Sequence, residues 1–183
     1  MSHSFVNPDL TLFSYEVLGL VGNEGIGPHD LLRMARRGRM LAWAGESQYY
    51  TAPKRLARLG LLQARREPGR TRERTVYELT DQGRAALLAW ARTPVRFPTF
   101  RNEALTRLMA ADLVGADAAL EGIATLRDDL DDVERELDAA TVSAHALPHR
   151  ERYLLLGQRL ARAYVEVTRA WLDEVERELG SGS

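Results

Sequence analysis

The stretch from residue 47 to residue 84 places the tightest constraint on the fold of this chain. With successive residues set 100° apart around a helix axis, Tyr49, Ala52, Leu56 and Leu59 fall on one side of a segment that starts near residue 47. The opposite side carries hydroxyl groups and cations, at Ser47, Tyr50, Thr51, Lys54 and Arg58. This spacing predicts a helix that packs one face on a core and exposes a polar, cationic face.

A β-hairpin and a further helix are predicted directly after this helix. Gly60 suits a helix C-cap, because glycine enters the left-handed region without a Cβ penalty. One strand is expected over residues 61–67 and its partner over 71–79 or 74–79, with the turn at Pro68-Gly69. The hydroxyl of Thr80 can cap a helix that runs from residue 81 to about residue 93.

The predicted hairpin carries an unusual density of positive charge. Within ten residues lie five arginines, at Arg65, Arg66, Arg70, Arg72 and Arg74. Only Glu67 and Glu73 oppose them in this segment, and such a density repels itself unless an anion is near. The hairpin therefore indicates an anion-binding surface. The alternative is a solvated edge hairpin whose charges prevent aggregation.

Residues in this region resemble the PadR-type transcriptional regulators. The matching residues, in order, are Tyr50, Lys54-Arg55-Leu56, Gly60-Leu61-Leu62, Arg74, Tyr77, Leu79, Thr80 and Gly83. The likeness covers about residues 10–95, and it implies a winged helix that binds DNA and represses neighbouring genes, relieved in many members by small aromatic or cationic ligands. Pro53 departs from the family pattern, and a proline there removes a helical hydrogen bond and is expected to bend the helix.

The flanking segments complete the predicted architecture. Apolar residues recur at helical spacing from Leu10 to Val21, and Pro28 suits the first turn of a second helix, so a helix-turn-helix precedes the hairpin. The second helix ends in a basic run, at Arg33, Arg36, Arg37 and Arg39, which either touches the DNA backbone or is a solvated face.

A proline-containing linker over residues 93–100 separates this module from a helical segment. We expect a short helix over residues 103–114 and then a coiled-coil type of apolar repeat, Ile123, Leu126, Leu130, Val133, Leu137 and Ala140. After a turn at Pro148, the last helix shows one apolar face, Tyr153, Leu156, Leu160, Tyr164, Val167, Trp171 and Val175. The two helices form an antiparallel hairpin. Their apolar area exceeds what they can hide in each other, so a second copy of the chain is expected to cover it, unless both pack on the first module.

The fold class is therefore mainly α with a small β-hairpin wing: a winged helix-turn-helix domain over residues 1–96 and a helical dimerisation domain over residues 97–183. Residues 1–96 hold 15 basic and 9 acidic residues, a net charge of +6, whereas the remainder holds 10 and 17, a net charge of −7. The first part suits a polyanion and the second would repel one.

Other function classes find little support in the sequence. The chain has no cysteine, which excludes disulfides and thiolate metal sites, and its four histidines are scattered. No phosphate-binding glycine loop or nucleophilic triad is evident, so we expect neither an enzyme nor a bound cofactor or metal. The acidic cluster over residues 128–136 is interpreted as the solvated back of the coiled-coil repeat. Without a signal peptide or membrane-spanning run, a cytoplasmic protein is expected.

The sequence thus predicts a homodimeric DNA-binding regulator that recognises an inverted repeat in double-stranded DNA. Predicted DNA contacts are Ser47, Gln48, Tyr50, Thr51, Lys54, Arg55, Arg58, Arg65, Arg66, Arg70, Arg72 and Arg74. An aromatic pocket for a small aromatic or cationic effector is a further hypothesis, with Trp43, Phe97, Phe100 and Trp171 as its walls. In the alternative interpretation of these residues, the aromatics are plain core. The alternative function of the whole module is a winged helix that binds an acidic protein partner.

Overall fold

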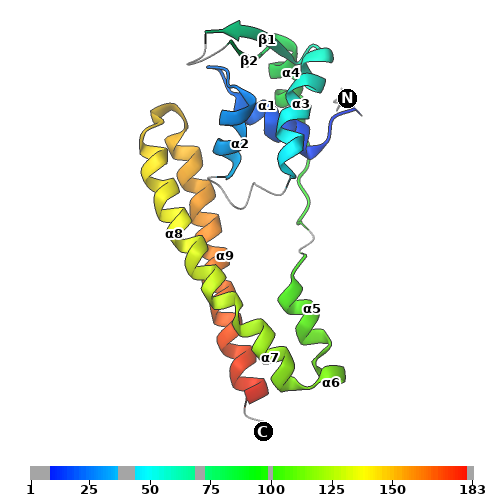
Figure 1. Ribbon diagram of the computed structural model, residues 1–183, viewed down its shortest axis with the longest axis vertical. Coiled ribbons are helices and arrows are strands. Elements are labelled where there is room, and N and C mark those ends of the chain that lie inside the picture. Colours follow the sequence, from blue (N-terminus) through cyan, green and yellow to red (C-terminus); the bar gives the residue numbers. More distant parts are fainter. Residues whose placement is uncertain (1–8, 37–43, 69–72, 99–100, 181–183) are drawn as a thin grey trace. The chain divides into compact units, whose positions relative to one another are not determined.

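The computed structural model describes residues 9–36, 44–68, 73–98 and 101–180 (Figure 1). The chain divides into two compact units, Met1–Arg96 and Phe97–Ser183. We call them the winged-helix unit and the helical unit and describe each by itself.

The winged-helix unit contains helices and one two-stranded sheet in the predicted order. Its elements are α1 (Leu12–Val21), α2 (Pro28–Arg36), α3 (Glu46–Arg58), β1 (Leu62–Glu67), β2 (Arg74–Leu79) and α4 (Asp81–Ala91). The strands pair antiparallel in a register that joins Leu62 to Leu79 and Glu67 to Arg74. Backbone hydrogen bonds between Ile26 and Tyr77 add a single bridge on the other side of β2. The predicted fold class, a winged helix-turn-helix, is confirmed.

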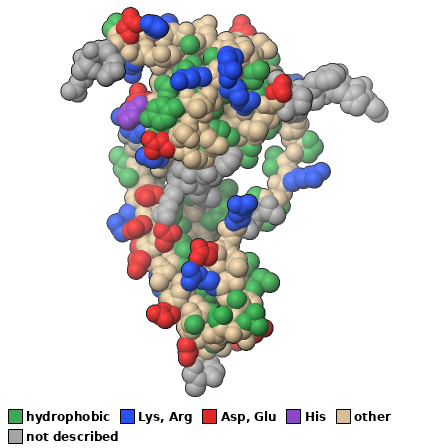
Figure 2. All heavy atoms as spheres, turned by 45° about the vertical axis from the view of Figure 1, so that its right-hand side comes forward, with side chains coloured by type: hydrophobic (Ala, Val, Ile, Leu, Met, Phe, Trp, Pro, Cys, Tyr) green, Lys and Arg blue, Asp and Glu red, His purple; other side chains and the backbone are tan. Residues whose placement is uncertain are grey.

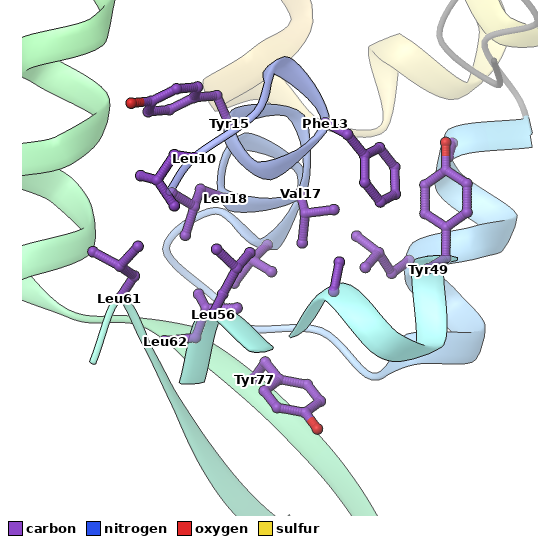
Figure 3. Packing of buried hydrophobic residues seen from close by; sticks show 14 of the residues in the cluster. Leu10, Phe13, Tyr15, Val17, Leu18, Tyr49, Leu56, Leu61, Leu62 and Tyr77 are labelled. Atoms are coloured by element: carbon purple, nitrogen blue, oxygen red, sulfur yellow. The ribbon is translucent and has the colours of Figure 1, made fainter. Parts of the chain in front are cut away.

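The core of this unit lies where α1, α3 and the start of the wing meet (Figure 3). Val17 and Leu18 of α1, Leu56 of α3 and Leu61 before β1 are almost completely shielded from solvent. Each such side chain contributes about 1.5–3 kcal/mol on burial. Of the four predicted inner residues, Tyr49, Ala52 and Leu56 are buried, and Leu59 at the C-cap is half-buried, so the polar face of the helix is held outward by a rigid support.

Tyr49 anchors α3 to α1 through two kinds of contact. Its ring meets Phe13 edge to face at a centroid distance of 5.0 Å, and its hydroxyl donates to Glu16 Oε1 at 3.0 Å. Burial, helped by the neighbouring carboxylate, raises the pKa of Tyr49 to about 12. Because this pKa exceeds that of a tyrosine in an unfolded chain, about 10, the stability of the unit is expected to fall as the pH rises from about 10 to 12.

The turn from the wing into α4 depends on two close contacts with the backbone after α3. Thr80 Oγ1 donates to the carbonyl of Gly60 at 2.7 Å and accepts from the N–H of Gly83 at 3.0 Å, which caps α4. A Cβ added to Gly83 would lie only 2.2 Å from the carbonyl oxygen of Leu61. The Thr-x-x-Gly spacing is thus explained by a capped helix that starts against another backbone segment.

The helical unit is built from five helices within its described residues. They are α5 (Glu103–Met109), α6 (Ala111–Val114), α7 (Ala116–Ala124), α8 (Leu126–His145) and α9 (Pro148–Gly180). Helices α8 and α9 form the predicted antiparallel hairpin, and Pro148 begins α9. The single helix predicted over residues 103–114 is wrong, because the chain breaks at Ala110 into α5 and α6.

The two long helices meet through a different face of α9 than the sequence suggested. The α8 side uses the predicted repeat, with Leu130 and Leu137 buried. The inner face of α9 consists of Ala161, Val165, Leu172 and Val175. Of the predicted apolar face, Val175 alone is buried, while Tyr164 and Trp171 are half-buried and the other four members are exposed. Helix α9 therefore has a second apolar face that its own unit leaves uncovered.

Ion pairs flank the contact between α8 and α9. Arg169 reaches Asp131 at 2.5 Å and Glu134 at 2.9 Å, and Arg127 reaches Asp173 at 2.6 Å. Two members of the acidic cluster that was interpreted as solvated, Asp131 and Glu134, thus pair with Arg169 of α9. Among the described residues there is no group of three or more side chains that could hold a metal ion, and no helix there is long and apolar enough to span a bilayer.

Candidate nucleic-acid interface

The outer side of α3 is a continuous exposed surface of polar and cationic side chains. We call it the reading face, and it consists of Ser47, Gln48, Thr51, Lys54 and Arg58. Gln48, which the helical wheel placed at the flank, is exposed with the others. Such side chains offer donors and acceptors for base edges and cations for phosphates. Charged side chains spread over the winged-helix unit, at the upper end of the view in Figure 2, include both arginines and carboxylates.

Two other predicted residues of α3 lie differently. Tyr50 is half-buried and packs against the core of the unit. Arg55 donates to the backbone oxygen of Asp9 at 2.9 Å and to Ser14 Oγ at 2.6 Å, so its guanidinium ties α3 to the start of α1. This corrects the picture of Arg55 as one more cation on the outer face. The hydrogen-bonding role was invisible in sequence because the partners are 46 and 41 residues away.

The proline within α3 does not end the helix. Helix α3 runs from Glu46 to Arg58 through Pro53, whose side chain is fully buried. Proline has no N–H, so the ordinary helical bond to the carbonyl of Tyr49 is missing. Because Pro53 points into the core, it takes no position on the reading face. Near it, Thr51 Oγ1 donates to the carbonyl of Ser47 at 3.1 Å within the same helix.

The described wing arginines are all paired with carboxylates. Arg65 lies 2.6 Å from Glu67 and 2.8 Å from Glu78, and Arg66 lies 3.1 Å from Glu73. Arg74 lies 3.1 Å from Glu67 and 3.4 Å from Asp30 of α2. The expectation of unmatched cations is therefore wrong for these three, because Glu67 pairs with two arginines at once and because Glu78 and Asp30 add acids from outside the ten residues considered. Arg70 and Arg72 lie outside the described residues.

A hollow of about 320 Å³ lies between the first turn of α2, the middle of α3 and the start of β2. Tyr50, Lys54 and Arg74 are the predicted residues that line it, and His29 and Thr75 join them. Sequence reasoning missed His29 and Thr75, since only the folded arrangement brings three elements to one place. The basic run of α2 is partly described: Arg33 and Arg36 are exposed and pair with Asp30 and Glu46, each at 2.7 Å, whereas Arg37 and Arg39 lie outside the described residues.

The hypothetical aromatic pocket stays a prediction, because only two of its four walls belong to the residues that the structure describes. Trp43 and Phe100 lie outside them, and Phe97 is 83% exposed. Trp171 packs, half-buried, on the core of the helical unit. Trp90 of α4 stacks on Tyr15 with their ring centroids 4.7 Å apart, and this contact holds α4 against α1.

The fold and the exposed α3 define a protein of the winged helix-turn-helix class. Residues 34–89 match the family model described as "Transcriptional regulator PadR-like family", so this segment is similar to the domain of that family. The predicted resemblance is confirmed. A search of curated proteins found no significant match.

Solved structures support the same architecture over nearly the whole chain. The virulence activator AphA of Vibrio cholerae is 22% identical, with a TM-score of 0.73 over 93% of this chain and 99% of that one. PadR of Bacillus subtilis in complex with operator DNA is 22% identical, with a TM-score of 0.66 over 90% and 99%. The same regulator with p-coumaric acid is 20% identical, with a TM-score of 0.60 over 91% and 99%. At these identities the likeness establishes the fold.

Proposed function

We propose that this chain is a transcriptional repressor, not an enzyme, and that it binds an inverted-repeat operator as a homodimer. The observation that carries the proposal is the reading face of α3, which exposes hydroxyl, amide and cationic groups from a helix whose other side is fixed in the core. A solved PadR structure holds operator DNA on the same fold. The second helix of a helix-turn-helix is the element that enters the major groove.

We assign different tasks to the members of this surface. Ser47, Gln48 and Thr51 have neutral groups that can accept from or donate to base edges, so they are proposed to set sequence preference. Lys54, Arg58 and the wing arginines are proposed to contact phosphates. Tyr50 contributes from the edge of the hollow beside Lys54. Arg55 is left out of the contact set because its guanidinium binds within the unit.

Dimerisation is proposed through the helical unit. The uncovered face of α9 carries an apolar stripe, Tyr153, Leu156, Leu160 and Val167, all exposed. Further exposed apolar side chains occur on α5 and α6, at Leu105, Met109, Leu113 and Val114, and Figure 2 shows green side chains gathered at that end of the unit. Exposed apolar surface on this scale marks an interaction site. A two-fold partner would also present two reading faces to half-sites about 34 Å apart.

Release by a small molecule is the remaining part of the proposal. Its support is the solved PadR structure with p-coumaric acid, which has the same fold. We expect a flat phenolic or cationic compound to quench tryptophan fluorescence and to displace a labelled operator duplex over the same concentration range. If no such compound quenches the fluorescence or displaces the duplex, the proposed release by a flat phenolic or cationic effector is wrong.

Selection of genomic fragments by the purified protein tests the central proposal. We expect enrichment of short inverted repeats, since a symmetric dimer reads the same half-site twice. Enrichment of single half-sites would contradict the dimer. No enrichment even at low salt would favour the rival function, an interaction module whose basic face binds an acidic protein.

Lys54 offers a direct test of the reading face. The change Lys54→Ala is expected to lower affinity for the selected operator by roughly 10-fold at about 0.1 M salt and to reduce the salt slope by about one, because one phosphate contact is lost. Fluorescence anisotropy at several salt concentrations measures both quantities. Arg92→Ala, which removes an exposed cation at the C-cap of α4, is the matched control and should leave both unchanged. Equal effects of the two changes would show that only total charge matters.

A further inference from the structure

The wing and the first turn of α2 share one continuous chain of ion pairs. From α2 outward, its members in order are Arg33, Asp30, Arg74, Glu67, Arg65 and Glu78. The distances between successive charged groups are 2.7, 3.4, 3.1, 2.6 and 2.8 Å. At its far end, Gln63 Nε2 donates to Glu78 Oε2 at 2.9 Å. We call this set the ion-pair chain.

Carboxylates occupy the inner positions of the ion-pair chain and arginines the outer positions. The side chains of Glu67, Glu78 and Asp30 are 23%, 24% and 31% exposed. Those of Arg65 and Arg74 are both 53% exposed. A phosphate that approaches from solvent therefore meets guanidinium groups whose positive charge is already balanced by the less exposed carboxylates.

Glu67 is the centre of this arrangement because it holds two arginines at once. Its Oε1 faces Arg65 and its Oε2 faces Arg74, which comes from the partner strand at the position directly opposite. Glu78 is held in its charged form, since hydrogen bonds from Gln63 and Arg65 lower the pKa of its carboxyl. Glu78 accordingly remains negative in the conditions under which DNA is bound.

Balanced arginines have a specific consequence for DNA binding. Binding without sequence preference is almost wholly electrostatic, whereas binding to an operator also gains from contacts with bases. A carboxylate beneath an arginine weakens the electrostatic part on every sequence and leaves base contacts intact. The free energy lost is therefore the same on random DNA and on the operator, but on random DNA the electrostatic part is almost the whole of the affinity.

We propose that Asp30, Glu67 and Glu78 restrain the wing arginines and so limit the part of DNA affinity that does not depend on sequence. This inference rests on the proposed function as a DNA-binding regulator. It differs from a supporting role for the same carboxylates, because it requires that their removal should strengthen binding.

The test is the isosteric change Glu67→Gln in the full chain. We expect affinity for a random-sequence duplex to rise by roughly 3- to 10-fold at about 0.1 M salt, with a salt slope steeper by up to about one. Affinity for the selected operator should rise by a similar factor, because the electrostatic part is common to both duplexes. Anisotropy titrations with both duplexes over a range of salt give all of these quantities, and thermal unfolding monitors the fold.

Two further variants make the result specific. Glu121→Gln changes the net charge equally at an exposed position of α7 and should leave both affinities unchanged. Adding Arg74→Gln to Glu67→Gln should cancel most of the gain, because the freed guanidinium is then absent. Lower or unchanged affinity of Glu67→Gln for both duplexes would overturn the inference. A wild-type chain that binds neither duplex would instead refute the proposed function itself.

Discussion

Gly83→Ala is expected to lower the free energy of unfolding of the winged-helix unit by about 3 kcal/mol or more. The new Cβ would stand 2.2 Å from the carbonyl oxygen of Leu61 and 2.8 Å from Leu79 Cδ1. The first of these atoms is backbone, so it cannot move aside without displacing the chain that links α3 to β1. For a unit of this size the midpoint of thermal unfolding should fall by more than about 10 °C.

Gly19→Ala is the matched control for that prediction. Gly19 lies within α1, and a Cβ built there meets nothing within 4 Å. In a helix this change is expected to stabilise by about 0.5–1 kcal/mol, because alanine loses less backbone freedom than glycine on folding. Thermal melts of both variants, followed by circular dichroism, should therefore move in opposite directions. A melt of Gly83→Ala that matched the wild type would mean that α4 does not approach the Leu61 backbone as closely as described.

Local signals explain why so much of the winged helix could be predicted. Tyr49, Ala52 and Leu56 recur at helical spacing, and all three are buried. Thr80 and Gly83 stand at a spacing that a capped helix requires, and the hydroxyl of Thr80 does accept from the N–H of Gly83. These features depend on residues a few positions apart, for which period and capping chemistry are informative.

Contacts between distant segments explain most of what the sequence could not reveal. The bond from Arg55 to Ser14 and the pairing of Arg74 with Asp30 join residues about forty positions apart. Counting charges within a window cannot detect such partners. The sequence therefore overestimated the free positive charge in the described part of the wing, and it did not reveal the hydrogen bonds that Arg55 makes within the unit.

The last helix was ambiguous for a different reason. Helix α9 is apolar on two sides, so its pattern could not identify which side meets α8. Ala161, Val165, Leu172 and Val175 form the inner face, while Leu156, Leu160 and Val167 lie on the exposed side. Helical spacing alone is compatible with either side, and the predicted face consisted mainly of the exposed residues. That the outer residues remain uncovered is the basis of the proposed dimer.

Leu160→Glu is expected to abolish dimerisation and, with it, high-affinity operator binding. Leu160 is 57% exposed in the middle of the apolar stripe, so its replacement should leave the helical unit folded. In a dimer the same change buries two uncompensated carboxylates, each at a cost of several kcal/mol. We expect light scattering to give a mass near 20.5 kDa in place of twice that value. Operator affinity should fall more than about 100-fold, because the second half-site no longer binds as part of the same complex.

Ala139→Glu separates this effect from charge alone. Ala139 is exposed on the side of α8 away from its buried residues, so the same acid there should alter neither mass nor affinity. A monomeric Leu160→Glu variant that kept full operator affinity would show that one winged helix suffices and that the inverted repeat is not read by a dimer. A dimeric variant with unchanged affinity would mean that the stripe is not the interface. Loss of dimer and of affinity together, with Ala139→Glu unaffected, is the outcome that links the uncovered face of α9 to the reading face of α3.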